Sequence, residues 1–271
     1  MKTRSNLRRL SAVFAVAAII PIGCAQRQEV RTIAETTTVT AAPQPPNPPP
    51  APVAEPPSAP AANPPAKEVN QLTLPEYQRV FPLPGDNWTL LFDGETLKGW
   101  ERTKFAGGGD VEVERGELRI GMGAMLSGVN LVATNDIPRY GYELALDAMK
   151  LDGSDFFCGL TFVVGDSCCS LIIGGWGGGL VGISSIDGND ASMNETTKFM
   201  EFPARQWFRV RVRVTRTKLE AWIGEAQVAN VTLEGRRLTV RPGEIELSQP
   251  FGIATYQTSA AFKNIQWRPL P

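Results

Sequence analysis

One polar stretch of this sequence, SSIDGNDASMNE, gathers the side chains best suited to proton transfer. Asp187, Asp190 and Glu195 alternate there with Asn189 and Asn194. The chain has no histidine, so carboxylates are the natural groups for general acid and base work. We expect Asp187 and Glu195 to be the catalytic candidates, and Asn189, Asp190 and Asn194 to bind a hydroxyl-rich ligand.

A second interpretation of the same stretch is a polar loop in which Asp and Asn shape the turns. Its clustered oxygens would also suit a calcium ion, but the spacing is not that of an EF-hand. No metal and no other cofactor is predicted.

Aromatic side chains give two further binding candidates. Trp176 stands among five glycines in GGWGGG, where bare backbone leaves its ring accessible as a platform for the apolar face of a sugar. Core packing is the alternative role of that ring. Arg211 and Trp222 form a second candidate pair, which would bind sugar only if their face of the sheet is the ligand-binding one.

The elements that must position these residues are strands. Apolar residues alternate with small or polar ones, and the pattern predicts strands over residues 156–164, 168–173 and 180–186, with a hairpin turn at Gly165-Asp166. This register places Phe162 opposite Cys169 and Cys158 near Ile173, so the thiols are too far apart for a disulfide. We expect them to be buried and unbonded.

The clearest strand pair is WFRVRVRV followed by KLEAWI. A tight turn sets Val214 opposite Leu219 in the core, while Arg211 meets Trp222 on the outer side. The pairing predicts a cation–π contact between Arg211 and Trp222 on the outer face of the sheet. The alternating arginines are interpreted as a solvated face, so truncation of Arg211 is expected to cost little stability.

Strands with turn residues every 8 to 12 positions continue to the end of the chain, and no segment has a sustained helical period. The pattern predicts an all-β fold, a jelly-roll sandwich of two antiparallel sheets. The formal net charge of −1 and the dispersed arginines argue against a nucleic-acid partner.

Composition divides the chain into four parts. Residues 1–24 have a basic start and an apolar core, as in a signal peptide, and Gly23-Cys24 resembles a bacterial lipobox, which implies acylation of Cys24. Residues 25–69 are a Pro-rich linker, and residues 70–87 are a transition in which Tyr77 is expected to pack on the folded part, residues 88–271. The protein is therefore predicted to be exported and lipid-anchored in the cell envelope, in the periplasm or outer membrane of a bacterium.

Two motifs resemble a known family. LFDGETLKGW, Leu91 to Trp100, is similar to the opening of the 3-keto-disaccharide hydrolase domain family, and FKNIQWRPL, Phe262 to Leu270, is similar to its closing strand. The resemblance implies a concanavalin A-like jelly roll, carbohydrate as the partner, and hydrolysis of a keto-glycoside. The two central strands here read FFCGLTFVV and CSLIIGG and lack the carboxylates of the family pattern. A non-catalytic glycan-binding module and a cell-envelope interaction domain remain the alternatives.

Overall fold

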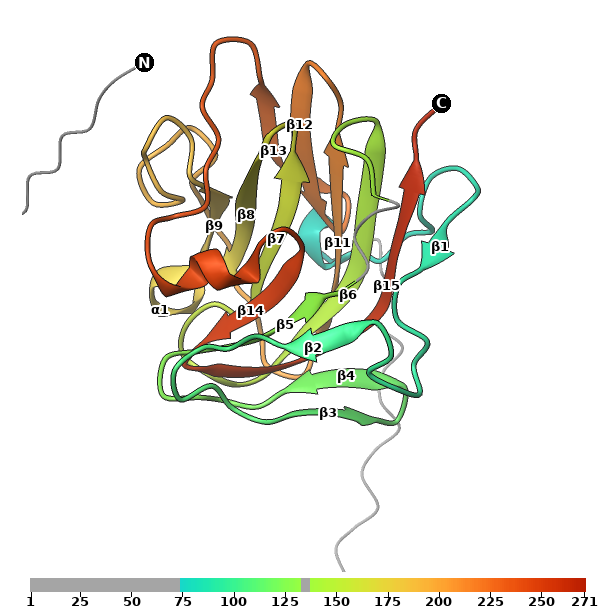
Figure 1. Cartoon of the computed structure of the whole chain (residues 1–271), viewed down its shortest axis with the longest axis vertical. Coiled ribbons are helices and arrows are strands. Elements are labelled where there is room, and N and C mark those ends of the chain that lie inside the picture. The colour runs from blue at the N-terminus through green and yellow to red at the C-terminus, as the bar shows by residue number, and fades with distance from the viewer. Residues whose placement is uncertain (1–73, 133–136) are drawn as a thin grey trace, which may run out of the picture. The chain divides into compact units, whose positions relative to one another are not determined.

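The computed structural model describes residues 74–132 and 137–271, which form the two packed β-sheets of Figure 1. The predicted fold class, an all-β sandwich of two antiparallel sheets, is confirmed. The predicted signal peptide, the acylation of Cys24, and the linker over residues 25–69 lie outside the described residues and stay predictions.

Sheet 1 has the strand order β13-β12-β11-β6-β15-β4-β3, and β1 pairs with β15. Its strands are β1 (Thr89–Leu90), β3 (Val111–Glu114), β4 (Glu117–Ile120), β6 (Tyr142–Gly153), β11 (Trp207–Val214), β12 (Lys218–Ile223), β13 (Ala226–Thr232) and β15 (Thr258–Pro269).

Sheet 2 has the strand order β10-β9-β8-β7-β14-β5-β2. Its strands are β2 (Trp100–Arg102), β5 (Leu126–Leu131), β7 (Cys158–Val164), β8 (Ser167–Gly174), β9 (Leu180–Ser184), β10 (Lys198–Phe199) and β14 (Gly252–Tyr256). Three short helical turns complete the described residues: η2 (Glu76–Gln78), α1 (Gly175–Gly178) and η3 (Glu244–Ser248). In this part of the chain no helix has the length and apolar character needed to cross a membrane.

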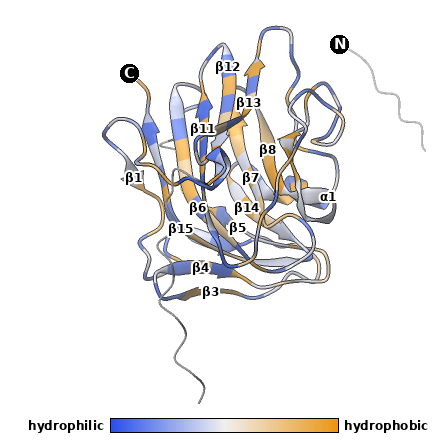
Figure 2. Ribbon diagram, turned by 180° about the vertical axis from the view of Figure 1, so that it is seen from behind, coloured by the Kyte–Doolittle hydropathy of each residue, from blue (hydrophilic) through white to orange (hydrophobic). Residues whose placement is uncertain are grey.

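The core lies between the sheets and follows the period-two pattern of the strands. In β11 every second residue from Phe208 to Val214 is buried, and Val214 pairs with Leu219 as predicted. Figure 2 shows mostly hydrophobic residues along β8, whereas β11 alternates in sequence between valine and arginine. Burial of one face of each strand fixes its register, because a slip of one residue would expose that face.

The predicted β7–β8 register is also confirmed. Phe162 pairs with Cys169, and Cys158 pairs with Ile173. The three described cysteines, Cys158, Cys168 and Cys169, are free and buried. Desolvation raises the pKa of Cys158 to about 12 and that of Cys169 still further, so both thiols stay protonated and act as small apolar side chains.

The last two strands differ from the prediction in one respect. The stretch PFGIATYQTSAAFKNIQW predicts two strands that join at Thr258-Ser259 and return the C-terminus to a sheet beside early strands. Instead the chain turns at Gln257, whose φ is 44°, so that β14 belongs to sheet 2 and β15 to sheet 1. The positive φ turns the backbone sharply, and the chain passes from sheet 2 to sheet 1 at this residue. As predicted, β15 returns beside early strands, here β1 and β4.

An N-terminal strap, residues 74–88, packs on the sandwich. Tyr77 stacks on Phe208 with ring centroids 6.4 Å apart and meets Phe202 edge-on at 6.1 Å. The expected packing of Tyr77 is thus confirmed. The backbone N–H of Glu225 donates to the carbonyl of Glu76 at 2.9 Å, which fixes the strap against the turn between β12 and β13.

We expect Gly224→Ala to loosen this strap. Gly224 has a φ of +56°, and an added Cβ would lie 2.5 Å from the Glu76 carbonyl oxygen. The combined strain and clash should lower the free energy of unfolding by about 2–3 kcal/mol in urea denaturation. The matched control is Gly235→Ala, because Gly235 also has a positive φ, +71°, but has no atom within 4 Å of its Cβ position. Equal losses in the two variants would show that the strap adds no stability.

Candidate functional site

A pocket of about 340 Å³ lies against the outer face of sheet 2. The period-two alternation of β8 turns Leu171 and Ile173 into the core and leaves Ser170 and Ile172 on the pocket side. Ser184 of β9, which pairs with Ser170, also lines the floor. The floor is therefore built from short side chains and an isoleucine, which leaves room for a ligand.

Apolar and aromatic side chains form part of the wall. Phe156, Leu126, Ile245 and Tyr256 line the pocket, and the rings of Phe156 and Tyr256 stack with centroids 5.8 Å apart. A mostly apolar wall with a few polar groups is the usual composition of a small-molecule site.

Trp176 projects from the tight turn after β8. Gly174 and Gly177 have φ values of 80° and 88°, and Trp176 itself has a φ of 48°, so the glycines allow the chain to reverse here. The indole is 43% exposed and lines the pocket. The structure thus places the predicted platform residue at the pocket and outside the core.

Asp155 stands beside this turn and is held by backbone N–H groups. Its two carboxylate oxygens accept hydrogen bonds from the N–H of Phe156 at 2.8 Å and of Gly177 at 3.2 Å. Asp155 lines the pocket. Its carboxylate therefore has a fixed orientation next to Trp176.

The long connection between β13 and β14 supplies the remaining wall, with η3 in orange-red near α1 in Figure 1. From this connection Arg241, Pro242 and Glu244 line the pocket. A carboxylate oxygen of Glu244 accepts a hydrogen bond from the backbone N–H of Ala106. The guanidinium carbon of Arg241 is 5.7 Å from the centroid of the Trp176 ring. The pocket thus combines an indole, two carboxylates and a guanidinium.

Asp187 and Glu195, the predicted catalytic pair, come together on Arg236. The Nε of Arg236 is 2.7 Å from Asp187 Oδ2, and its Nη2 pairs with Glu195 Oε1. Asp187 also accepts a hydrogen bond from the backbone N–H of Arg237 at 2.8 Å. Neither carboxylate is among the residues that line the pocket. Their catalytic role stays a prediction, and their position favours a different pair of carboxylates.

Asn189, Asp190 and Asn194 mainly shape the loop between β9 and β10. The Asn194 amide donates to the carbonyls of Ile183 at 2.8 Å and Asp190 at 2.7 Å, and Asn189 exchanges backbone hydrogen bonds with Ile186. Asp190 also approaches the pocket, because its Oδ2 is 3.7 Å from the Arg241 guanidinium. The contacts match the turn-shaping interpretation, with Asp190 as the link to the site.

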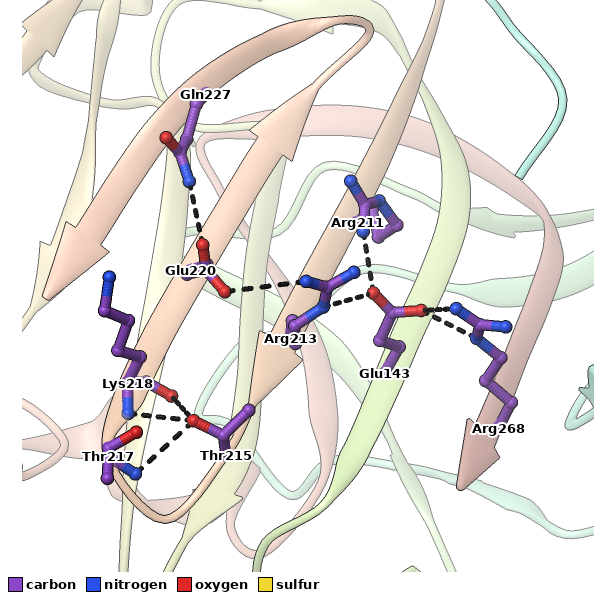
Figure 3. Close-up of polar contacts among 9 residues, drawn as sticks. All are labelled: Glu143, Arg211, Arg213, Thr215, Thr217, Lys218, Glu220, Gln227 and Arg268. Atoms are coloured by element: carbon purple, nitrogen blue, oxygen red, sulfur yellow. Dashed lines mark hydrogen bonds and ion pairs between the residues drawn. The ribbon is translucent and has the colours of Figure 1, made fainter. Parts of the chain in front are cut away.

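Arg211 and Trp222 lie on the outer face of sheet 1, away from the pocket on sheet 2. The predicted cation–π contact is confirmed, with the Arg211 guanidinium carbon 3.7 Å from the Trp222 ring centroid. The prediction of a solvated arginine face is wrong. Arg211 is only 16% exposed in its side chain and donates to Glu143, which is fully buried, as Figure 3 shows.

Sequence reasoning missed the residues on the long β13–β14 connection. Arg241 and Glu244 belong to no motif, and Tyr256 was assigned only to a strand. Asp152 and Asp155 fall at one turn in the sequence, and nothing local distinguishes the two carboxylates. The length of the β13–β14 connection was the available signal, since connections of this size are uncommon unless they have a function.

Within residues 74–132 and 137–271 no group of three or more His, Cys, Asp or Glu side chains is arranged to hold a metal ion. The hydroxyl groups on the floor are few. Thr161 and Ser170 share a hydrogen bond of 2.7 Å. The chemistry available at the pocket is therefore that of two carboxylates, one guanidinium, a phenol and the serine hydroxyls.

Two solved structures are similar to this chain at low sequence identity. A structure described as a glycosyl hydrolase from Parabacteroides distasonis has 15% sequence identity to this chain and a TM-score of 0.44. The match covers 68% of this chain and 94% of that one. The carbohydrate-binding module CBM66 from Bacillus subtilis has 12% identity and a TM-score of 0.44, over 63% of this chain and 95% of that one. A search of curated proteins found no match.

A family model describes more than half of the sequence. The match covers residues 87–268, from the end of the strap through most of β15, and so includes both sheets and every residue that lines the pocket. On this match the chain belongs to the 3-keto-alpha-glucoside-1,2-lyase-like domain family.

Proposed function

We propose that this is a carbohydrate-active domain that cleaves a 3-keto-glycoside at the pocket beside Trp176. The observation that carries the proposal is the convergence of Trp176 with two carboxylates, Asp155 and Glu244, at one pocket of about 340 Å³. That volume is at the lower end of known ligand sites and suits one or two sugar rings. The family description supports the keto-glycoside as the substrate.

The chemistry of such a substrate explains why two carboxylates suffice. A ketone at C3 acidifies the C–H bond at C2, so a carboxylate is able to remove that proton. The electron pair of the C2–H bond passes to C2 and C3 as an enolate. The enolate then collapses: the C3 carbonyl re-forms, a C1–C2 double bond forms and the C1–O bond breaks. The departing oxygen takes a proton from a second group. Water adds afterwards if the overall result is hydrolysis.

We assign the base to Asp155 and the acid to Glu244. Asp155 has the more fixed carboxylate, because two backbone N–H groups hold it beside the Trp176 turn. Glu244 comes from a different segment, the β13–β14 connection. In an α-glucoside chair the C2–H and C1–O bonds point to opposite ring faces, so a base and an acid from separate segments suit this elimination.

The assay compares a 3-keto-α-glucoside with the same glucoside before oxidation. The expected result is release of the aglycone, together with an enone that absorbs in the ultraviolet, from the keto substrate alone. The unoxidised glucoside lacks an acidic C2–H and should remain intact. Cleavage of both at equal rates would contradict an elimination.

Trp176→Ala is expected to weaken binding of the sugar about tenfold, which corresponds to ~1.4 kcal/mol of stacking on the indole. Titration calorimetry with the keto-glucoside, or its unoxidised analogue, measures the change. Trp222→Ala is the matched control, because Trp222 lies on the outer face of sheet 1. If Trp222→Ala lowered the affinity for the sugar as much as Trp176→Ala, the result would contradict a binding site on sheet 2 and favour one on sheet 1.

A glycan-binding module is the second candidate. The pocket floor favours it, since Ser170, Ile172 and Ser184 supply no carboxylate from β8 or β9. Binding of a sugar at Trp176 with no turnover of any keto-glycoside would establish this alternative.

A further inference from the structure

Arg241 is the only Lys or Arg among the described residues that line the pocket. Its side chain is 56% exposed. A guanidinium has five N–H donors in a rigid planar fork and no acceptor. The contacts of these N–H donors therefore indicate which class of ligand the pocket accepts.

Little of this donor capacity is used by the residues that the structure describes. Among them Arg241 has one ion pair, with Asp190 at 3.7 Å, and its guanidinium carbon lies 5.7 Å from the Trp176 ring centroid. The other oxygen of Asp190 accepts from the backbone N–H of Ser192 at 2.9 Å and from its hydroxyl at 2.6 Å. Asp190 is thus fixed by its own loop and holds the guanidinium only loosely near the indole.

Among the described residues, neither carboxylate of the pocket forms an ion pair with Arg241, whose ion pair is with Asp190. Asp155 accepts hydrogen bonds from the backbone N–H groups of Phe156 and Gly177, and Glu244 accepts one from the backbone N–H of Ala106. Arg236, on the same connection, differs because it pairs closely with Asp187 and Glu195. The two arginines therefore have different roles. Arg236 joins two loops, whereas most N–H donors of Arg241 are available to a ligand in the pocket.

We propose that the sugar bound at this pocket has a negatively charged substituent, a carboxylate or a sulfate, and that Arg241 recognises it while the ring stacks on Trp176. The inference rests on the proposed carbohydrate function and adds the substrate class. Guanidinium binds such oxyanions through two parallel charge-assisted hydrogen bonds, which a neutral hydroxyl group does not provide. The oxyanion would take the place that Asp190 now occupies at long range.

The test measures the affinity of the full chain for three disaccharides with the same backbone: a uronate, its carboxyl-reduced neutral form, and a sulfated form. Wild-type protein should bind at least one of the two anionic forms about tenfold to a hundredfold more tightly than the neutral form. The uronate and sulfate arms show which oxyanion is preferred. The preference should decrease as NaCl is raised, because salt screens charge.

Variants separate the recognition of charge from general binding. Arg241→Gln should abolish the anionic preference by weakening the anionic forms much more than the neutral form, while Arg241→Lys should retain only part of the preference because it lacks the planar fork. Asp190→Asn removes the internal competitor and should tighten binding of the anionic sugar about two- to fivefold. Arg115→Gln, a change of the same charge at the β3–β4 turn, is the control and should have no effect.

Three results would overturn the inference. If the neutral sugar binds as well as both anionic forms, or if Arg241→Gln weakens all three equally, the pocket does not select charge while the carbohydrate function stands. If none of the three sugars binds to the wild-type protein, the inference fails, and the keto-glucoside assay decides separately whether the proposed function stands.

Discussion

Replacing Glu143 by alanine is expected to lower the free energy of unfolding by about 3–5 kcal/mol, the usual loss when one partner of a buried ion pair is removed. Glu143 is completely buried. One of its carboxylate oxygens accepts from Arg211 at 2.7 Å and Arg213 at 2.8 Å, and the other accepts from Arg268 at 2.7 Å. Figure 3 shows the arginines converging on this single carboxylate from both sides.

The large loss follows from what the alanine would leave behind. Three guanidinium groups that are mostly removed from water would face one another without the charge that they surround. Chemical denaturation checks the prediction, and Glu101→Ala on β2, where the side chain is exposed, is the matched control. A loss below about 1 kcal/mol for Glu143→Ala would mean that water screens this cluster well.

The same cluster predicts the direction of acid sensitivity. Burial acts to raise the pKa of Glu143, but the hydrogen bonds from Arg213 and Arg268 and the charge of Arg211 outweigh it, so the pKa lies below its ordinary value of 4.5. A lowered pKa in the folded state stabilises the fold above the ordinary value, and this stability is lost as the pH falls through the lowered one. Glu143→Gln should remove this part of the acid dependence.

The largest effect on activity is expected for Asp155→Asn. Loss of the proposed base should reduce kcat for the 3-keto-glucoside by about 10²- to 10⁴-fold, with binding of the sugar nearly unchanged. The asparagine side chain has the same shape, and one oxygen still accepts a backbone hydrogen bond. Steady-state kinetics and the melting temperature together separate a catalytic loss from a structural one.

The double variant Asp187→Asn/Glu195→Gln is the direct comparison, because it tests the carboxylates that the sequence suggested. Removal of their exposed ion pairs with Arg236 should cost about 1 kcal/mol of stability or less and leave kcat within a few fold of wild type. Retained activity in Asp155→Asn together with lost activity in the double variant would return the catalytic assignment to Asp187 and Glu195.

Sequence predicts structure best in this protein where one face of a strand is buried. The alternating valines of β11 and the apolar positions of β7 permit only one register, and the pairs Val214–Leu219 and Phe162–Cys169 follow from it. The same alternation wrongly predicted that the arginines on the outer face of sheet 1 are solvated. Glu143 and the arginines of β11 have the alternation of exposed residues, but β6 lies between β11 and β15, so arginines from both neighbours surround Glu143.

The site was harder to predict because its parts are distant in sequence and follow no period. Trp176 was found because five glycines around one indole are unusual. Asp155 and Arg241 belong to separate connections, and nothing local indicates that they line the same pocket. The polar loop from Asp187 to Glu195 has the composition of a site, but its side chains are used for its own turns and for Arg236.

The stacking of Tyr77 has a practical consequence for anyone who produces the domain. The family match begins at residue 87, ten positions after a ring that packs against Phe202 and Phe208. A gene fragment trimmed to the family boundary would encode a sandwich with one end of its core open to water. Expression of a domain with an intact core therefore needs a start at or before residue 74, where the described strap begins.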